Sequence, residues 1–266
     1  EAHVMRASFT RLHALLFLLA AAVVLPPTHA AAAASAPAEV SYASGPETVH
    51  ALLYTPAGDR AGKHPAVIVI HEWWGLNDWV KEQAADLAAH GYIALAIDLY
   101  RSQVATDADT AHQLSRGVPQ DRGIRDLKAA EAYLSSQKNV DPHRIGAIGW
   151  CMGGGYALSF AVADPNLKAV VANYGPPPTD PDSLKQIKAA ILGNYGGLDK
   201  GIPPASVESF AADMKKLGNP VDTKIYPDAG HAFENPNNKT GYRAQDAADA
   251  RSRYLHFFAR ELGGKP

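Results

Sequence analysis

The stretch Gly149-Trp150-Cys151-Met152-Gly153 places a cysteine between two glycines, where a strand pattern gives way to a helix pattern. A sharp strand-to-helix turn crowds the backbone around its central residue. Glycine two positions to either side relieves that crowding, because it has no Cβ. In this context G-x-C-x-G is a nucleophile elbow in which cysteine replaces the usual serine. The sulfur would lie at a helix N-terminus, where free N–H groups and the helix dipole favour the thiolate.

Two other interpretations of the pentapeptide are open. A lone cysteine beside an apolar strand can be a small buried hydrophobe, and glycine-rich turns also cradle phosphates in dinucleotide-binding folds. Cys151 is the only cysteine in the chain, so an intrachain disulfide and a thiolate-cluster metal site are excluded.

The composition predicts a soluble globular protein with one sizeable core. The chain has 266 residues, of which 47% are hydrophobic and 20% charged, and its formal net charge is −2. No basic block indicates nucleic acid as a partner. None of the 11 histidines has metal-ligand spacing: His71-Glu72 lacks the second histidine of a zinc helix, since position 75 is glycine. We therefore expect neither a metal nor a cofactor.

The N-terminal part of the chain has the pattern of a secretory signal peptide. A basic region around Arg6 and Arg11 precedes the apolar run 15–25, and Ala30 ends a small-x-small cleavage pattern. We expect a signal peptide over 1–30 cleaved near Ala30, a disordered linker over 31–38 and one domain over 39–266. The alternative, an uncleaved membrane anchor, is disfavoured because the run is short for a bilayer. The mature protein is then exported to the periplasm or secreted, as a monomer without stable membrane association.

From residue 39 onward, strand patterns alternate with helix patterns, which predicts an α/β fold with a mostly parallel sheet covered by helices on both faces. Ligands of such sheets lie at the carboxyl ends of the strands. We expect 49–54 to be an edge strand and 175–182 to be a turn-rich loop. The other expected strands are 67–70, 92–97, 145–148, 169–172, 189–192 and 221–226, and the expected helices are 78–89, 121–137, 153–162, 203–217 and 243–262.

Two further polar residues follow expected strands at the same edge as Cys151. Asp199 follows the strand over 189–192, and His231 follows the strand over 221–226. A thiol nucleophile needs a base, and the base needs an orienting carboxylate. The chain order nucleophile, acid, histidine is that of α/β-hydrolases. Taken singly, Asp199 could be a turn residue or helix cap and His231 a solvated loop residue. The acids that compete with Asp199 less well are Asp98, Asp180, Asp182 and Asp228.

Five motifs together identify a resemblance. The chain is similar, from about Val49 to Leu262, to the dienelactone hydrolase family, thiol-dependent members of the α/β-hydrolase fold. The motifs are His71-Glu72-Trp73-Trp74-Gly75-Leu76-Asn77, Asp98-Leu99-Tyr100-Arg101, Gly149-Trp150-Cys151-Met152-Gly153-Gly154, Gly196-Gly197-Leu198-Asp199 and Gly230-His231-Ala232-Phe233.

The resemblance implies Cys151 as nucleophile, Asp199 as orienter and His231 as base. It also implies that Glu72 contacts the resting thiol and helps to generate the thiolate. A carboxylate there can accept the thiol proton, and while charged it opposes a permanent thiolate that would oxidise.

Two backbone N–H groups are the expected donors to the oxyanion of a tetrahedral intermediate. The elbow geometry nominates Met152, the residue after the nucleophile, and the resemblance nominates Trp73.

The substrate clamp departs from the family pattern, which has two arginines that hold an anionic lactone. Arg101 comes one position early, and Asn235 stands where the second arginine is expected. A neutral amide does not replace a planar bidentate cation, although Arg243 is a possible distant substitute. We expect substrate contacts from Arg101 and Asn235, together with aromatic residues. Trp73, Trp74, Trp79, Trp150, Tyr100 and Phe233 are candidates for an aromatic pocket wall, with ordinary core packing as the alternative for about half of them.

The expected function is thiol-dependent hydrolysis of a small-molecule carboxylic ester or lactone, of the carboxymethylenebutenolidase type, through a Cys-Asp-His triad and an acyl-enzyme. Two alternatives stand beside it: a general carboxylesterase without lactone preference, and a non-catalytic binding protein on the same scaffold.

Overall fold

The computed structural model describes residues 36–58 and 62–264. The expected signal peptide over 1–30 lies outside the described residues, as does most of the expected linker. Strand β1 already begins at Ala38, the last residue of that linker. No helix within the described ranges is long and apolar enough to cross a membrane.

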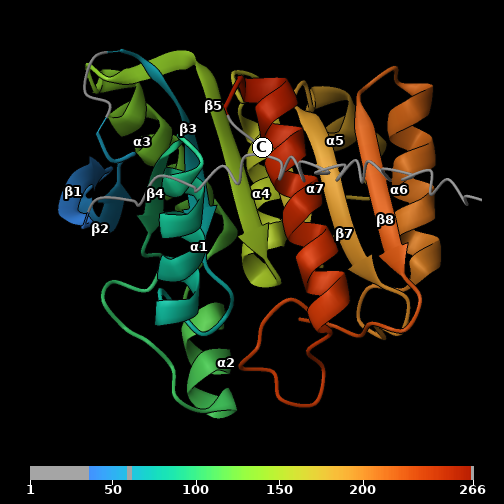
Figure 1. Ribbon diagram of the computed structural model, residues 1–266. Helices are drawn as coiled ribbons and strands as arrows, with labels where there is room; N and C mark the ends of the chain where they lie inside the picture. The colour runs from blue at the N-terminus through green and yellow to red at the C-terminus, as the bar shows by residue number, and fades with distance from the viewer. Residues whose placement is uncertain (1–35, 59–61, 265–266) are drawn as a thin grey trace, which may run out of the picture. The chain divides into compact units, whose positions relative to one another are not determined.

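Eight strands form one sheet in the order β1-β2-β4-β3-β5-β6-β7-β8 (Figure 1). The β1–β2 and β2–β4 pairs are antiparallel, and all pairs from β4 to β8 are parallel. The mostly parallel sheet predicted from the sequence is thus confirmed. The strands are β1 (Ala38–Ser44), β2 (Glu47–Tyr54), β3 (His64–Ile70), β4 (Ile93–Ile97), β5 (Val140–Trp150), β6 (Ala169–Asn173), β7 (Ala190–Gly196) and β8 (Val221–Tyr226).

Helices cover both faces of the sheet because alternate residues of each buried strand point to opposite sides. In β3, Val67 and Val69 join the core under α1 and α7, whereas Ile68 and Ile70 join the core under α3 and α4. Figure 1 shows α1 and α7 in front of the sheet. The helices are α1 (Asp78–Ala89), α2 (Ala108–Arg116), α3 (Gln120–Ser136), α4 (Met152–Ala163), α5 (Pro181–Gln186), α6 (Pro204–Lys216) and α7 (Ala244–Leu262).

Two local predictions need correction, and two elements were missed. Strand β2 is not an edge strand, because β1 pairs with its residues 47–53 and forms the edge of the sheet. Only Tyr42 and Ser44 of β1 are buried, so its alternation was too weak to detect. The short helix α2, capped by the side chain of Asp107, was also missed. The loop expected over 175–182 ends at Asp180, whose side chain caps α5.

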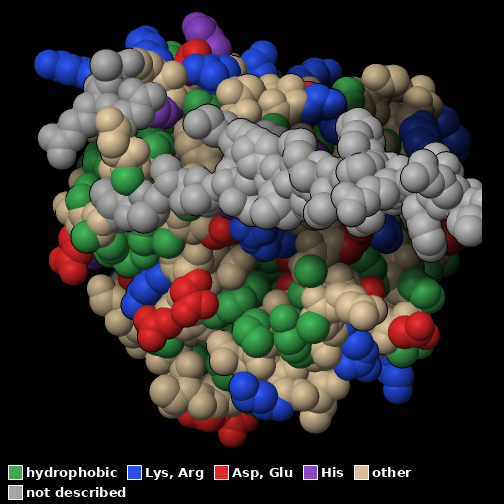
Figure 2. Space-filling model, in the orientation of Figure 1, with side chains coloured by type: hydrophobic (Ala, Val, Ile, Leu, Met, Phe, Trp, Pro, Cys, Tyr) green, Lys and Arg blue, Asp and Glu red, His purple; other side chains and the backbone are tan. Residues whose placement is uncertain are grey.

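The chain changes direction across the sheet between β3 and β5. From β3 it moves to β4 on one side, and then returns past β3 to β5 and continues outward to β8. The carboxyl ends of neighbouring strands diverge at such a switch point, which opens a crevice for a ligand. In Figure 1 these ends point downward, toward α2 and the long loop after β8. In the same orientation, Figure 2 shows a group of hydrophobic side chains in the lower half of the visible face.

Candidate active site

Cys151 lies between β5 and α4 in a backbone conformation that side chains rarely adopt, with φ 54° and ψ −118°. Its amide donates a hydrogen bond to the carbonyl oxygen of Asn173, 3.0 Å away. The flanking glycines are required sterically: a Cβ on Gly149 would lie 2.1 Å from the carbonyl oxygen of Gly153, and one on Gly153 would lie 2.4 Å from that of Ile70. The turn therefore has the tight geometry expected of a nucleophile elbow.

Asp199 and His231 come together from the loops after β7 and β8. The His231 Nδ1 lies 2.7 Å from Oδ2 of Asp199, whose side chain is only 3% exposed against 40% for the histidine. The other carboxylate oxygen accepts hydrogen bonds from the backbone N–H groups of Gly201 and Ile202. These contacts fix the carboxylate, so it can hold the imidazole in one orientation with Nε2 free for proton transfer.

Glu72 follows β3 and is almost completely buried. Its Oε2 accepts a hydrogen bond from Nδ2 of Asn235 at 2.7 Å, and its Oε1 accepts one from the Tyr174 hydroxyl at 3.4 Å. Burial raises the pKa of Glu72 to about 7, although both hydrogen bonds act in the opposite direction. A carboxyl with this pKa can exchange a proton near neutral pH.

The Cys151 thiol is protonated in this arrangement. Burial and, after it, the charge of Glu72 raise its pKa to about 12, although hydrogen bonds from the backbone N–H groups of Met152 and Trp73 act in the opposite direction. The sequence suggested that the helix N-terminus would favour a thiolate. Burial and the neighbouring carboxylate outweigh that effect. Within the described part of the chain, no hydrogen bond joins the sulfur to His231.

A cavity of about 800 Å³ opens above these groups. Glu72, Cys151 and His231 all line it, together with Trp73 and Trp74 from the turn after β3. Most of the remaining wall comes from the loop after β8, through Ala232, Asn235, Asn237, Asn238, Lys239 and Thr240, with Asn77 and Ala105 completing it. Cavities of this size, largely apolar with a few convergent polar groups, are typical small-molecule sites.

Two aromatic residues expected at the substrate lie behind the cavity wall. The Tyr100 hydroxyl donates a hydrogen bond to the Trp73 carbonyl oxygen at 3.0 Å and lies 3.3 Å from the Met152 sulfur. It therefore braces the two turns that supply the N–H donors. Phe233 is fully buried and packs on Tyr174.

The four tryptophans divide evenly between the cavity and the core. Trp73 and Trp74 line the cavity, whereas Trp79 and Trp150 pack edge-to-face in the core with ring centroids 5.3 Å apart.

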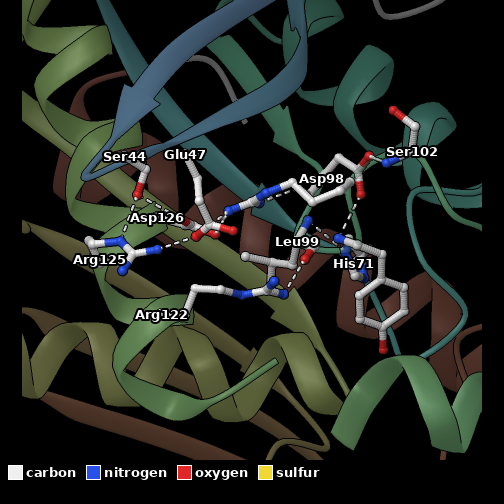
Figure 3. Close-up of polar contacts among 11 residues, drawn as sticks. Ser44, Glu47, His71, Asp98, Leu99, Ser102, Arg122, Arg125 and Asp126 are labelled. Carbon is white, nitrogen blue, oxygen red and sulfur yellow. Dashed lines mark hydrogen bonds and ion pairs between the residues drawn. The ribbon is translucent and has the colours of Figure 1, made fainter. Parts of the chain in front are cut away.

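Arg101 does not reach the cavity, contrary to the expectation of a substrate contact. Figure 3 shows the region around Asp126, where side chains from β1, β2, α3 and the turn after β4 gather. The Arg101 guanidinium lies 2.8 Å from Oδ2 of the fully buried Asp126 and 3.4 Å from Glu47, which also pairs with Arg125. Arg101 therefore links the start of β2 to α3. Arg243, the other candidate cation, is exposed and donates to backbone carbonyl oxygens, including that of Asp228.

Several residues at the site were missed by the sequence argument. Tyr174 directly follows β6 and contacts both Glu72 and the His231 ring. Glu234 is another buried carboxyl, beside Asn235. The only available signal for Tyr174 was its position after a buried strand. The loop after β8 carries no periodic pattern, so nothing indicated that Asn237 and Lys239 turn toward the cavity.

Comparison with known proteins gives the family. The sequence profile of the dienelactone hydrolase family matches residues 49–262. Proteins of Methylorubrum extorquens and Escherichia coli named "Putative carboxymethylenebutenolidase" are each 34% identical over 218 residues, covering 77% of this chain and 74% and 79% of theirs.

Solved structures agree with this assignment. A structure named as a dienelactone hydrolase of Klebsiella pneumoniae superposes with a TM-score of 0.77 at 29% identity, covering 86% of this chain and 99% of that one. A dienelactone hydrolase-like promiscuous phosphotriesterase from metagenomic libraries gives 0.79 at 25% identity, with the same coverage. This chain therefore belongs to the dienelactone hydrolase family and has the α/β-hydrolase fold.

Proposed function

We propose that this hydrolase cleaves carboxylic esters or lactones with Cys151 as its nucleophile, through a thioester intermediate. One observation carries the proposal: Cys151, Glu72 and His231 line one cavity. The N–H groups of Met152 and Trp73 contact the sulfur, and Asp199 is hydrogen-bonded to His231. Each is a part that acyl transfer requires, namely a nucleophile, oxyanion donors, a proton acceptor and an oriented base.

In the first step, the thiol proton passes to the Glu72 carboxylate or directly to His231, and the thiolate attacks the substrate carbonyl carbon. The N–H groups of Met152 and Trp73 contact the sulfur in the resting site. Rotation of the thiolate toward the substrate frees them to bind the oxyanion. Donors of this kind are worth about 2.7–4 kcal/mol each to the transition state.

In the second step, the tetrahedral intermediate collapses and the bond between the carbonyl carbon and the leaving oxygen breaks. The proton taken from the thiol passes to the leaving oxygen, either from His231 directly or from Glu72 by way of His231. Water then attacks the thioester while His231 accepts its proton, and the carboxylic acid leaves with Cys151 restored as a thiol or thiolate. Asp199 stabilises the imidazolium that forms in each half-reaction.

A general carboxylesterase is the second candidate, and the cavity gives a specific reason for it. Neither position of the expected arginine clamp presents a cation to the cavity: Arg101 pairs with Asp126, and Asn235 is neutral. Lys239, a cation that does line the cavity, donates to the carbonyl oxygen of Pro236. The absence of a cavity-lining guanidinium at both clamp positions favours substrates beyond an anionic lactone. A panel of anionic lactones, neutral lactones and simple esters separates the two candidates.

Replacing Cys151 by alanine tests the proposal. We expect Cys151→Ala to abolish hydrolysis of p-nitrophenyl acetate, and Cys151→Ser to be poor as well, because the site is tuned for a thiol. Ser159→Ala serves as the control, because Ser159 lies on α4, the helix that follows Cys151, and the change in side-chain size is similarly small. This variant should keep wild-type turnover. Retained turnover in Cys151→Ala contradicts the proposal, and a wild-type thiol inert to iodoacetamide favours a non-catalytic binding protein.

A further inference from the structure

The Trp73 indole contacts a residue that lies outside the cavity. It packs against Trp74 with ring centroids 4.9 Å apart, and both tryptophans line the cavity. It also meets the His112 imidazole of α2 edge-to-face, with ring centroids 4.8 Å apart and ring planes inclined at 82°. His112 is not among the described residues that line the cavity. Trp73 is therefore the link between α2 and the space that would hold a substrate.

The backbone of this turn is held by hydrogen bonds, whereas the indole of Trp73 is not. The Tyr100 hydroxyl donates to the Trp73 carbonyl oxygen at 3.0 Å, and the Ala105 amide donates to the Trp74 carbonyl oxygen at 2.9 Å. The indole N–H of Trp73 forms no hydrogen bond with any residue that the structure describes. Packing alone, including the contact with His112, therefore holds the indole in the cavity wall.

Helix α2 presents His112 with little burial of its own. The Asp107 carboxylate caps the helix, accepting hydrogen bonds from the Thr110 N–H and hydroxyl at 2.8 Å each. Of the nine residues of α2, all of them described, only Ala111 is buried. The His112 side chain is exposed, and within residues 36–58 and 62–264 its imidazole forms no hydrogen bond. His112 can therefore be replaced without opening a core or leaving a polar partner unpaired.

We propose that His112 is a positioning residue that holds the Trp73 indole in the cavity wall and thereby limits the size of the ester group that fits beside it. The edge-to-face contact favours the held orientation of the indole over a displaced one by about fivefold. A compact group fits beside the held indole, whereas a planar aromatic group has to displace it. The Trp73 backbone stays in place in both cases, because the Tyr100 hydroxyl holds its carbonyl oxygen. The preferred substrates are then esters with a compact group next to Trp73.

The inference rests on the proposed function only in taking this cavity as the ester site. The ratio of rates for a large and a small ester reports on the shape of the cavity wall, whichever residue attacks the carbonyl. Failure of the Cys151→Ala test would therefore reject the nucleophile and leave the size measurement to be decided by itself.

The test is His112→Ala, measured on two substrate series, since an ester can place either its acyl or its alcohol group beside Trp73. In one series the acyl group of a p-nitrophenyl ester grows from acetyl to benzoyl. In the other, the alcohol of an acetate ester grows from ethanol to 1-naphthol. We expect the kcat/KM of the larger substrate relative to the smaller to rise about fivefold in at least one series, the effect of one aromatic pair. General damage to the fold would instead lower both substrates alike.

Three further variants complete the test. His112→Phe keeps an aromatic edge and should retain the wild-type ratios. His112→Gln keeps a polar side chain without the ring and should behave as His112→Ala. Gln113→Ala is the matched control, because it truncates the next exposed side chain of the same helix, and it should also retain the wild-type ratios.

Three results overturn the inference: wild-type ratios in both series for His112→Ala, ratios for His112→Phe that shift as far as those for His112→Ala, or an equal rise in Gln113→Ala. Should His112→Ala fail to fold, as judged by thermal unfolding, His112→Gln decides in its place by the same criteria.

Discussion

Cys151 is held at rest as a thiol, and its surroundings explain how a lone cysteine at a cavity can remain reduced. Burial and Glu72 oppose ionisation, while the N–H groups of Met152 and Trp73 are ready to stabilise negative charge on sulfur or on substrate oxygen. Oxidation proceeds through the thiolate, so a protonated resting thiol is protected. In the proposed mechanism Glu72 or His231 then takes the proton, and the pKa of Glu72, which burial raises to about 7, links activity to pH near neutrality.

Asn235 is the cavity residue at which the preference between anionic and neutral substrates can be tested. It lines the cavity and hydrogen-bonds Glu72. We expect Asn235→Arg to raise the ratio of kcat/KM for a carboxylate-bearing lactone to that for a neutral ester by about tenfold, the worth of one charge-assisted hydrogen bond. Taking the ratio cancels any effect of the new cation on the thiol.

Asn235→Gln is the matched control, since it lengthens the side chain without adding charge, and its ratio should stay at the wild-type value. Equal changes for the anionic and neutral substrates in Asn235→Arg would mean that this position does not contact the substrate carboxylate. Steady-state kinetics on purified variants measure both outcomes.

At the scale of single residues, strand-end position was the useful signal. Asp199 and His231 follow parallel strands, and such ends share one edge, so their meeting could be expected from the sequence. Arg101 also follows a strand end, but its partner Asp126 lies on a helix in a different part of the sequence. Sequence spacing indicates where the backbone of a residue lies in the sheet, but it does not indicate which oppositely charged side chain the residue will pair with.

At the scale of elements, helix α4 packs so closely on the sheet that one of its residues must lack a side chain. A Cβ on Gly153 would lie within 2.5 Å of the carbonyl oxygens of Ile70 and His71. Alanine has a helix propensity about 1 kcal/mol more favourable than that of glycine. The clash outweighs this gain, because the atoms that the Cβ would meet belong to the backbone and cannot move aside as a flexible side chain can. We expect Gly153→Ala to lower the free energy of unfolding by more than about 2 kcal/mol and to abolish esterase activity.

Gly155→Ala provides the comparison within the same helix, because its Cβ would meet only the Pro176 ring at 3.1 Å. Urea unfolding should place it within about 1 kcal/mol of the wild type. A Gly153→Ala variant as stable as Gly155→Ala would contradict the close packing of α4 on the turn after β3.

Long elements with clear periodicity were predicted well, and short ones were not. Buried strands such as β3 and β4 contain continuous apolar runs, which the sequence displays directly. Strand β1 buries only Tyr42 and Ser44, and α5 has six residues with one buried leucine. These elements form because neighbouring parts of the protein cover or cap them, and that information is not local.

At the scale of the whole molecule, the site depends on the switch point between β3 and β5. The two strands place Glu72 and Cys151 side by side, and the loops after β7 and β8 complete the cavity. That the sheet is mostly parallel and covered on both faces could be expected from the alternation of strands and helices. The path of residues 231–240 could not, since that loop is fixed by individual contacts such as the Asn238 side chain on the carbonyl oxygen of His231.

The most direct test of the nucleophile is the mass of the intact chain during turnover. Rapid acid quenching of the wild-type protein mixed with p-nitrophenyl acetate should reveal a species heavier by one acetyl group, with fragmentation placing that group on Cys151. The same experiment on Cys151→Ala should show no such species. An acetyl group on another residue, or steady turnover by Cys151→Ala, would contradict the account.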